Sequence, residues 1–512
     1  MRAGVDFSTA PPGTTVAAAE RALAWAPRLA WLASLAPFLL YLKTAAPTVY
    51  NLDSAELSTA AWTVGVPHPP GYPLYVLLGK AFSFIPVGDV GYRLNLMSAV
   101  FAGLTLVALY FIVLHLTGSR VAGLTASWLL GFSYHFWADA VVAEVYTLDA
   151  FLLASLVLLL LRWSVSGKAS TLALAFFVCG LGLAHRTTFL LCFPAVALYM
   201  VLNLRRMGRR WWLAPLAMLP GLALYGLLPL RSATASPYIW GSSYDLSGRA
   251  IELNLASRSM LWWFVSARVF QPFTHVYDFR GFLSQLWEFA GWTWRGFLGI
   301  GVVLALLGMP YLWRRRWREA LLLALIFIPQ TAFYANYSVP DKNTMFLPSF
   351  LVIAVAAGAG ACALLALARS ALRRPALGVA VASCLLIAPT LVAAANYRLL
   401  NISGDYRARE QSVSLFRLVE PNSIVIGWWT DIAPLEYMQR VEGQRPDVSL
   451  IQSWAVNGQF LVDLATANLP ARAVYVMHDE PALDSRFDLQ PVGQWYRVEP
   501  PDPPPAKTGE TP

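Results

Sequence analysis

The sequence predicts an all-α polytopic membrane protein of about 11 transmembrane helices, followed by a small α/β domain outside the membrane. Composition is the first observation behind this fold class. Of 512 residues, 57% are hydrophobic and only 13% are charged, whereas a soluble protein carries about 25% charged residues. The second observation is a change after Ala395, where short strand-like runs replace long apolar runs. Most of the chain is therefore expected to be solvated by lipid.

The transmembrane helices are predicted from apolar runs, because spanning a bilayer takes about 20 mostly apolar residues. These runs lie at 29–48, 95–116, 121–137, 141–161, 170–185, 188–204, 211–230, 296–313, 319–337, 345–367 and 375–395. Residues 72–86 (YPLYVLLGKAFSFIP) are short for a span and contain Lys80. They predict a re-entrant or interfacial helix.

The basic residues predict the orientation of these spans. Lys and Arg gather in alternate turns, at 162–168, 205–210, 314–318 and 369–374, while the intervening short turns hold only Arg186 and Lys342. The positive-inside rule places those clusters and the N-terminal segment 1–28 in the cytoplasm. The transmembrane domain 29–396 then has its long loops 49–94 and 231–295 on the outer face. The alanine-, arginine- and tryptophan-rich usage suggests a bacterium, so we expect the inner (cytoplasmic) membrane.

The segment after the last span predicts an α/β domain at 397–498, on the periplasmic side. SIVIGWW, DVSLIQS and RAVYVMHD are typical of short strands, and IAPLEYMQRV of a helix between the first two. The proline-rich end, 499–512, predicts a disordered tail.

Charge and cysteine placement exclude two classes of function. The net charge of +9 comes from short turns rather than from a basic face interleaved with aromatics, so no nucleic-acid partner is expected. The four cysteines lie inside apolar runs without CxxC or Cys/His spacing. Neither a disulfide framework nor a zinc site is predicted.

The stretch NLDSAELSTAAWTVGVPHPPGYPLY, residues 51–75, places Asp53, Glu56 and His68 just outside the first span. One interpretation is purely structural: Asp53 is a helix N-cap and Glu56 its capping-box partner. The other is a polar site at the membrane face, held by the stiff turn His68-Pro69-Pro70-Gly71, which cannot continue a helix. The two interpretations are compatible.

One carboxylate among cations suits transfer of a sugar from a lipid phosphate. The acceptor hydroxyl needs one general base, and the leaving phosphate needs positive charge, which arginine supplies through paired hydrogen bonds. Arg186, Arg231 and Arg258 are expected on the same side of the membrane as Asp53. A glycosidase would need carboxylates on both sides of the sugar, which a pair three residues apart does not provide.

LDSAEL, GVPHPPGYPLY, AEVYTLDAF, LPLRSATASPYIWG and RPDV resemble a family of polytopic membrane proteins whose animal member is a protein O-mannosyltransferase. This family is grouped with the GT-C superfamily of polyprenol-dependent glycosyltransferases. The resemblance covers about residues 30 to 450, and HPPGYPLY is its most specific element. It implies a GT-C fold, a polyprenyl-phosphate sugar donor, inversion at the anomeric carbon, and mannose as a candidate sugar.

The resemblance also implies roles for single residues. Asp53 matches the catalytic acid of the first outer loop, and Glu56 accompanies it. The other positions that match near that face or in the large loop are His68, Arg93, Glu144, Arg231, Trp240 and Arg258. No metal site is predicted with certainty, although Asp53 and Glu56 could hold a divalent cation. The acceptor is left open among protein, lipid and glycan.

Two other classes of protein are alternatives for this sequence. A transporter or flippase of polyprenyl-linked sugars would use the same arginines, but it would carry polar groups near the bilayer midplane and paired, broken helices. The predicted span centres are almost free of charge, and no internal repeat is present. A structural scaffold would leave the acid-and-histidine loop unexplained. The preferred hypothesis is a membrane glycosyltransferase with Asp53 as general base.

Overall fold

The computed structural model describes residues 29–209, 211–234, 238–372 and 375–500. Within these residues, six helices are long and apolar enough to cross a membrane, or up to seven spans if one bent pair counts as a single span. The six are Val90–Thr117, Tyr146–Ser166, Trp211–Ala233, Trp317–Ala335, Leu347–Ala368 and Ala376–Leu400. The predicted all-α membrane class is confirmed, while the predicted number of eleven spans is not.

The chain divides into two compact units, each built from three separate stretches of sequence. The first unit contains residues up to Ala45 together with Leu96–Leu224 and Val269–Ser403. The second contains Ala46–Asn95, Tyr225–Arg268 and the chain from Gly404 onward. The predicted outer loop 49–94 and the predicted α/β domain therefore share one unit.

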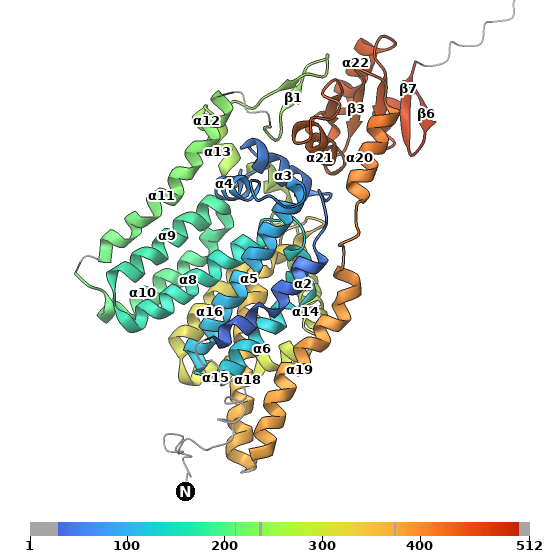
Figure 1. Ribbon diagram of the computed structural model, residues 1–512. Helices are drawn as coiled ribbons and strands as arrows, with labels where there is room; N and C mark the ends of the chain where they lie inside the picture. Colours follow the sequence, from blue (N-terminus) through green and yellow to red (C-terminus); the bar gives the residue numbers. More distant parts are fainter. Residues whose placement is uncertain (1–28, 210, 235–237, 373–374, 501–512) are drawn as a thin grey trace, which may run out of the picture. The chain divides into compact units, whose positions relative to one another are not determined.

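The first unit is helical. Its α-helices, with α5 shared with the second unit, are α2 (Ala36–Thr44), α5 (Val90–Thr117), α6 (Arg120–Gly131), α7 (Tyr134–Ala140), α8 (Tyr146–Ser166), α9 (Ala169–His185), α10 (Phe193–Leu202), α11 (Leu219–Leu222), α14 (Phe279–Gly296), α15 (Ile300–Arg315), α16 (Trp317–Ala335), α17 (Lys342–Met345), α18 (Leu347–Leu372) and α19 (Pro375–Leu400). Short 3₁₀ segments are η1 (Ala30–Leu35), η2 (Thr187–Cys192), η3 (Leu204–Arg206), η4 (Trp211–Met218) and η6 (Arg268–Phe273). Figure 1 shows α8 and α9 side by side.

Two glycines let α15 and α18 pack backbone to backbone. A Cβ atom at Gly308 would overlap the carbonyl of Ala356, and one at Gly360 would overlap the carbonyl of Leu304. Small residues at such crossings allow membrane helices to approach closely, where van der Waals contact replaces the hydrophobic driving force.

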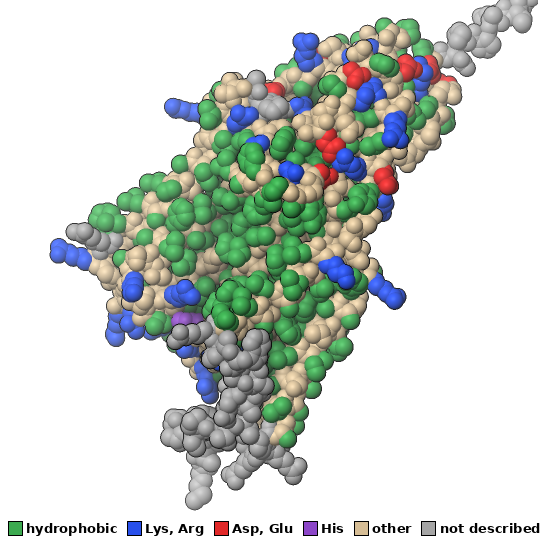
Figure 2. Space-filling model, in the orientation of Figure 1, with side chains coloured by type: hydrophobic (Ala, Val, Ile, Leu, Met, Phe, Trp, Pro, Cys, Tyr) green, Lys and Arg blue, Asp and Glu red, His purple; other side chains and the backbone are tan. Residues whose placement is uncertain are grey.

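The surface of the first unit is apolar. Leu39, Leu104, Leu306, Ile328 and Ile387 each expose 40% or more of their area, and Figure 2 shows a broad expanse of hydrophobic side chains over these helices. Exposed apolar patches of this extent mark a surface that water does not cover, which agrees with a membrane-embedded unit.

Two predicted spans are interrupted. The predicted span 121–137 breaks after Gly131, because Ser133 takes an extended backbone and a second helix, α7, begins at Tyr134. The predicted span 141–161 begins only at Tyr146. Ahead of it, the backbone N–H of Glu144 donates to the Ser98 hydroxyl at 3.1 Å and the Glu144 carbonyl accepts from it at 3.3 Å. A side chain thus satisfies the polar groups that a helix would otherwise pair.

The second unit begins with short helices. These are α3 (Asp53–Thr63), α4 (Pro73–Phe82), η5 (Ala223–Gly226), α12 (Leu227–Ala233) and α13 (Arg258–Val265). A small hairpin pairs β1 (Ser243–Tyr244) with β2 (Ala250–Ile251). The predicted loop 231–295 is therefore partly structured, since it contains α13 and α14, and α14 is bent by 109° against α15. The predicted short helix within 72–86 is α4.

The rest of the second unit is a five-stranded sheet with helices. The strand order is β4-β3-β5-β7-β6, in which β4, β3 and β5 run parallel and β7 and β6 form an antiparallel edge. The elements are α20 (Arg407–Leu418), β3 (Ile424–Gly427), α21 (Trp429–Arg440), β4 (Ser449–Gln452), η7 (Ser453–Ala455), α22 (Gly458–Asn468), β5 (Val474–Val476), α23 (Pro481–Asp484), β6 (Asp488–Val492) and β7 (Trp495–Glu499). Its core includes Ile424, Ile426, Ile451, Leu464 and Val476.

The strands and the helix predicted within residues 397–498 are present in the structure. The three predicted strands are β3, β4 and β5, and the predicted helix is α21. The prediction missed α20, α22 and the hairpin β6–β7. Helix α19 continues to Leu400, past the predicted start of the domain at residue 397. Most of the predicted tail, 501–512, and the N-terminal segment 1–28 lie outside the described residues.

Candidate active site in the second unit

Helix α3 positions the two acids that the sequence singles out. Asp53 is its first residue and Glu56 lies in its first turn, where the helix dipole favours negative charge. The preceding residue, Leu52, has φ 58° and ψ −144°, a conformation that costs a non-glycine residue of order 1–3 kcal/mol. The structure differs from the predicted capping box: α3 begins at Asp53, with Leu52 at the N-cap position, and the Glu56 carboxylate binds His68 instead.

Glu56 binds the stiff turn that follows α3. Its carboxylate is fully buried and accepts a hydrogen bond from the backbone N–H of His68 at 2.6 Å. The Nδ1 atom of His68 lies 3.1 Å from Oε2 of the same carboxylate. The turn itself is closed by the Gly71 N–H, which donates to the His68 carbonyl at 2.9 Å. Glu56 therefore fixes both the backbone and the ring of His68.

The other ring nitrogen of His68 faces Asp53 and a tyrosine. Nε2 lies 3.8 Å from Oδ2 of Asp53 and 3.0 Å from the hydroxyl of Tyr72. The Asp53 side chain is 19% exposed, whereas those of His68 and Glu56 are 7% and 0% exposed. Asp53 is thus the member of this acid–histidine cluster (Asp53, Glu56, His68, Tyr72) that a substrate can reach most easily.

Aromatic side chains form one wall of the acid–histidine cluster. The Trp429 ring lies 5.4 Å from that of His68 and 6.5 Å from that of Trp240, edge to face in both pairs. Trp240 also packs on Trp454 and Phe264, and it is only 2% exposed. A substrate could therefore contact the Trp240 ring only if neighbouring rings moved.

The backbone ties this wall to the histidine turn. The Val66 N–H donates to the Tyr238 carbonyl at 2.9 Å, and the Trp240 N–H donates to the Val66 carbonyl at 2.8 Å, which forms a parallel bridge between Val66 and Ile239. Residues 238–240 are therefore hydrogen-bonded to Val66, which lies two residues before His68.

Arg231 does not lie beside Asp53. Its Nε and Nη2 atoms donate to the carbonyls of Val64 and Thr63 at 2.8 and 3.3 Å, and Lys80 donates to the nearby Trp62 carbonyl at 2.6 Å. Both cations therefore cap the C-terminal end of α3, where the helix dipole favours them. Asp53 is ten residues away at the other end, about 15 Å at a rise of about 1.5 Å per residue.

The two remaining predicted arginines of the second unit differ in their surroundings. Arg93 donates to the backbone carbonyls of Ser83, Val87 and Gly88 at 2.6–2.9 Å, so it holds the loop after α4 together. Arg258 is exposed at the start of α13, and no hydrogen bond or ion pair joins it to another described residue. Arg258 is consequently available to an anionic ligand.

The first unit contains two of the predicted residues, Arg186 and Glu144. Arg186, at the connection between α9 and η2, is buried, pairs with Asp149 at 3.4 Å and donates to the Tyr334 hydroxyl at 3.2 Å. Its guanidinium also lies 4.8 Å from the Tyr146 ring. Glu144 lies just before α8, where its backbone binds Ser98 as described above.

Two members of the candidate site were not among the predicted residues. Tyr72 stands in the GVPHPPGYPLY block, and its spacing of four from His68 is the signal that could have identified it. The contact of Trp429 with His68 joins residues 361 positions apart, which no local pattern predicts. Across the described residues, no group of three or more His, Cys, Asp or Glu side chains is arranged to hold a metal ion.

Known structures identify the class of fold. A crystal structure of ArnT from Cupriavidus metallidurans bound to undecaprenyl phosphate superimposes with a TM-score of 0.56 at 12% identity, over 92% of this chain and 97% of that one. The Archaeoglobus fulgidus oligosaccharyltransferase, in a complex with zinc and sulfate, gives 0.54 at 13% identity, over 88% of this chain and 67% of that one. The chain therefore has the GT-C fold that the sequence predicts.

Sequence comparison finds similar proteins for part of the chain. Residues 53–208 match the family model described as the protein O-mannosyl-transferase TMEM260 N-terminal domain. The mouse protein O-mannosyl-transferase TMEM260 is 32% identical over 206 residues, which are 38% of this chain and 29% of that protein. The Dictyostelium discoideum protein is 26% identical over 232 residues, 41% of this chain and 28% of its own length. The chain thus matches less than a third of either relative, and the predicted resemblance is confirmed for this region.

Proposed function

We propose that the chain is an integral membrane glycosyltransferase that moves a sugar from a polyprenyl-phosphate donor to an acceptor hydroxyl. The observation that carries the proposal is the acid–histidine cluster: a partly exposed Asp53 beside His68, which a fully buried Glu56 holds in place. This cluster begins the segment that matches the O-mannosyl-transferase family model. The fold is one in which solved relatives are described with undecaprenyl phosphate or a dolichol-phosphate, and mannose is the donor sugar that the related names favour.

In the proposed reaction Asp53 takes the proton of the acceptor hydroxyl as the acceptor oxygen attacks the anomeric carbon. The bond between that carbon and the donor phosphate breaks, and its electrons leave with the phosphate. A single displacement of this kind inverts the anomeric configuration. Glu56 orients His68, and His68 with Tyr72 positions Asp53 without touching the reacting atoms.

The leaving phosphate needs a cation. Arg258 suits this role because it is exposed and unpaired among the described residues. Arg231 has two of its five N–H groups committed to α3, and Arg186 is already paired with Asp149. We therefore assign the phosphate first to Arg258, with Arg231 as a further candidate. A divalent cation held by Asp53 is an alternative source of charge, which transfer assays with and without chelator distinguish.

The substitution Asp53→Asn tests the proposed chemistry. Removing a general base lowers the transfer rate by about 10²–10⁴-fold, measured with purified protein and radiolabelled polyprenyl-phosphate sugars. Asp463→Asn, in the exposed part of α22, is the matched control and should retain full activity. Near-normal turnover by the Asp53→Asn protein would reject the assignment, and movement of the lipid-linked sugar across vesicles without transfer would favour a flippase instead.

We further propose that the second unit faces the periplasm of a bacterial inner membrane and that the N-terminus is cytoplasmic. In a protein lacking the exposed Cys384, a membrane-impermeant maleimide should label Ser247→Cys in intact spheroplasts. It should label Ser166→Cys only after permeabilisation. The reverse pattern would contradict the orientation.

A further inference from the structure

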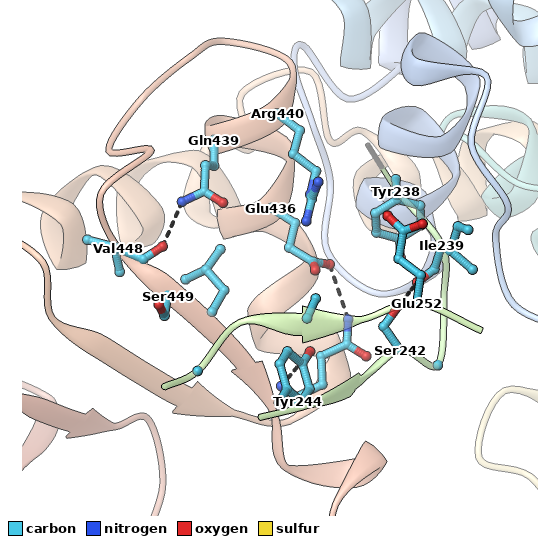
Figure 3. A pocket seen from close by; sticks show the side chains of 15 residues that line it. Tyr238, Ile239, Ser242, Tyr244, Glu252, Glu436, Gln439, Arg440, Val448 and Ser449 are labelled. Atoms are coloured by element: carbon cyan, nitrogen blue, oxygen red, sulfur yellow. Dashed lines mark hydrogen bonds between the residues drawn. The ribbon is translucent and has the colours of Figure 1, made fainter. Parts of the chain in front are cut away.

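A polar pocket of about 190 Å³ lies inside the second unit, between residues 238–252 and the α21–β4 segment. Figure 3 shows Glu436 and Arg440 extending from α21 toward Tyr238 and Glu252. The acid–histidine cluster contributes none of the side chains that line it. The pocket is therefore a separate cavity within the same unit.

The charges in the pocket favour an uncharged ligand. Two carboxyl groups, of Glu252 and Glu436, accompany a single guanidinium, that of Arg440, which lies 5.9 Å from the Tyr238 ring. A phosphate or carboxylate ligand would meet more acid than base here. A cationic ligand would meet the positive charge of Arg440, which already acts on the Glu436 carboxyl.

The remaining lining offers hydrogen-bond donors and acceptors beside apolar surface. Gln439 donates both amide N–H groups to the carbonyls of Arg445 and Val448, at 2.7 and 2.9 Å, so it offers its side-chain oxygen as an acceptor. The Gln452 amide donates to the Glu436 carboxylate at 3.1 Å and has a second N–H group. Ile239, Val448 and Leu450 supply apolar contacts. A sugar ring matches this mixture, because its hydroxyls both donate and accept while its C–H faces are apolar.

Size and position narrow the ligand further. Pockets for drug-sized ligands measure about 300–1,000 Å³, so this smaller cavity suits one ring rather than an oligosaccharide. One wall includes Tyr238 and Ile239, and Ile239 forms the bridge with Val66 in the segment that leads to the histidine turn. A sugar ring in the pocket would therefore contact a segment whose backbone partner, Val66, lies two residues before His68 of the candidate catalytic cluster.

We propose that this pocket binds a single neutral hexopyranose ring belonging to a glycosylated acceptor. The binding itself does not depend on the proposed function, but the assignment of the ring to an acceptor rests on it. Acceptors that already carry one sugar would then be better substrates than unmodified ones.

The binding is tested with full-length protein in lipid nanodiscs, in the Asp53→Asn background so that no transfer occurs. Free mannose, glucose, galactose and N-acetylglucosamine are titrated separately and followed by saturation-transfer NMR. Ala250→Trp would fill the pocket, since Ala250 lines it. Ile251→Trp is the matched control, because neighbouring strand residues point to opposite faces and Ile251 is already 53% exposed.

At least one sugar should bind saturably with a dissociation constant in the millimolar range. Ala250→Trp should weaken that binding at least about tenfold, while Ile251→Trp changes it less than about twofold; a tenfold change is well outside the effect of ordinary surface substitutions. Glu436→Gln provides a second variant that leaves the hairpin intact, and it should also weaken binding severalfold. Absence of saturable binding by the parent protein, or equal binding by both tryptophan variants, would overturn the proposal.

The role at the acceptor is tested separately in the active protein. A singly glycosylated peptide should have a lower KM than the bare peptide, and Ala250→Trp should abolish that difference. Sugar binding without any preference among acceptors would leave a sugar site but remove its assignment to the acceptor. Transfer by Asp53→Asn tests the proposed catalytic function, whereas sugar binding by the same protein tests the pocket, so failure of either proposal can be told from failure of the other.

Discussion

At the scale of single residues, the buried carboxylate of Glu56 decides how the candidate site is built. A buried charge is costly unless it is hydrogen-bonded, and Glu56 meets this condition through the backbone and ring of His68. Its role is positioning, because the fully buried side chain has no surface for substrate.

Glu56→Gln should therefore keep the fold and slow transfer. Hydrogen bonds to charged groups contribute about 1.5–3 kcal/mol, which corresponds to a loss of about 10- to 150-fold if the loosened histidine raises the barrier by that amount. The measurement is kcat as a function of pH. In the variant, both the maximum of kcat and the shape of its pH dependence should change. A variant that unfolds more easily but keeps the parent profile would show a structural role only.

The residues of the acid–histidine cluster were predictable to different degrees. Asp53, Glu56 and His68 stand within one short stretch, so sequence alone indicated a common site. The direct contact of Glu56 with the His68 backbone was not predictable, because it competes with a capping box that the same letters fit equally well. Trp429 and Tyr238 reach the site only through tertiary packing.

At the scale of elements, helix α3 carries two acids in its first turn, and two cations from other elements, Arg231 and Lys80, donate to the carbonyls at its last turn. Arg231 was predicted to bind donor phosphate, whereas in the structure it binds the C-terminal carbonyls of α3. Local periodicity could not reveal this contact, since Arg231 and Val64 are 167 residues apart.

Replacement of Arg231 distinguishes these two roles. Arg231→Met removes two hydrogen bonds and a favourable charge at a helix end, so the free energy of unfolding should fall by about 1–3 kcal/mol. Arg258→Met, at an exposed position, should change stability by less than about 0.5 kcal/mol but raise the KM for the donor. Thermal unfolding in detergent and donor kinetics give the two readouts. A higher donor KM without lost stability in Arg231→Met would restore the phosphate role.

Whole helices and strands were predictable only where their own residues carry a local pattern. Long apolar runs and the alternating strands β3, β4 and β5 were predicted because their own residues carry the signal. The break between α6 and α7 depends on the backbone of Ser133, and the edge hairpin β6–β7 contains the short strand DLQPV (Asp488–Val492), which includes a proline. Neither feature has a periodicity that distinguishes it from its surroundings.

At the scale of the whole molecule, the stability of the second unit should depend on pH through Glu436. Burial raises the pKa of this carboxyl to about 7, with Glu56 adding to the effect and Arg440 and Gln452 opposing it. The folded pKa exceeds the ordinary value of 4.5. The protonated form is therefore favoured in the folded state, and stability declines as the pH rises from about 4.5 through 7.

Glu436→Gln should remove this decline. The parent protein should lose of the order of 3 kcal/mol relative to the variant between pH 5 and 8, since one pKa unit corresponds to about 1.4 kcal/mol. Chemical unfolding of the detergent-solubilised proteins at a series of pH values measures the difference. Glu252→Gln, at an exposed position of the same pocket, serves as control, and parallel curves for the parent and Glu436→Gln would contradict the expectation.

The parallel bridge between Val66 and Ile239 has a thermodynamic consequence. A molecule that selects one backbone arrangement of residues 238–240 must also favour the matching arrangement of the chain beside His68. By linkage, a substrate bound at Asp53 must then strengthen the binding of that molecule by the same free energy. Two adjoining sites that are joined by a pair of main-chain hydrogen bonds can thus change each other's binding affinity without any large movement of the fold.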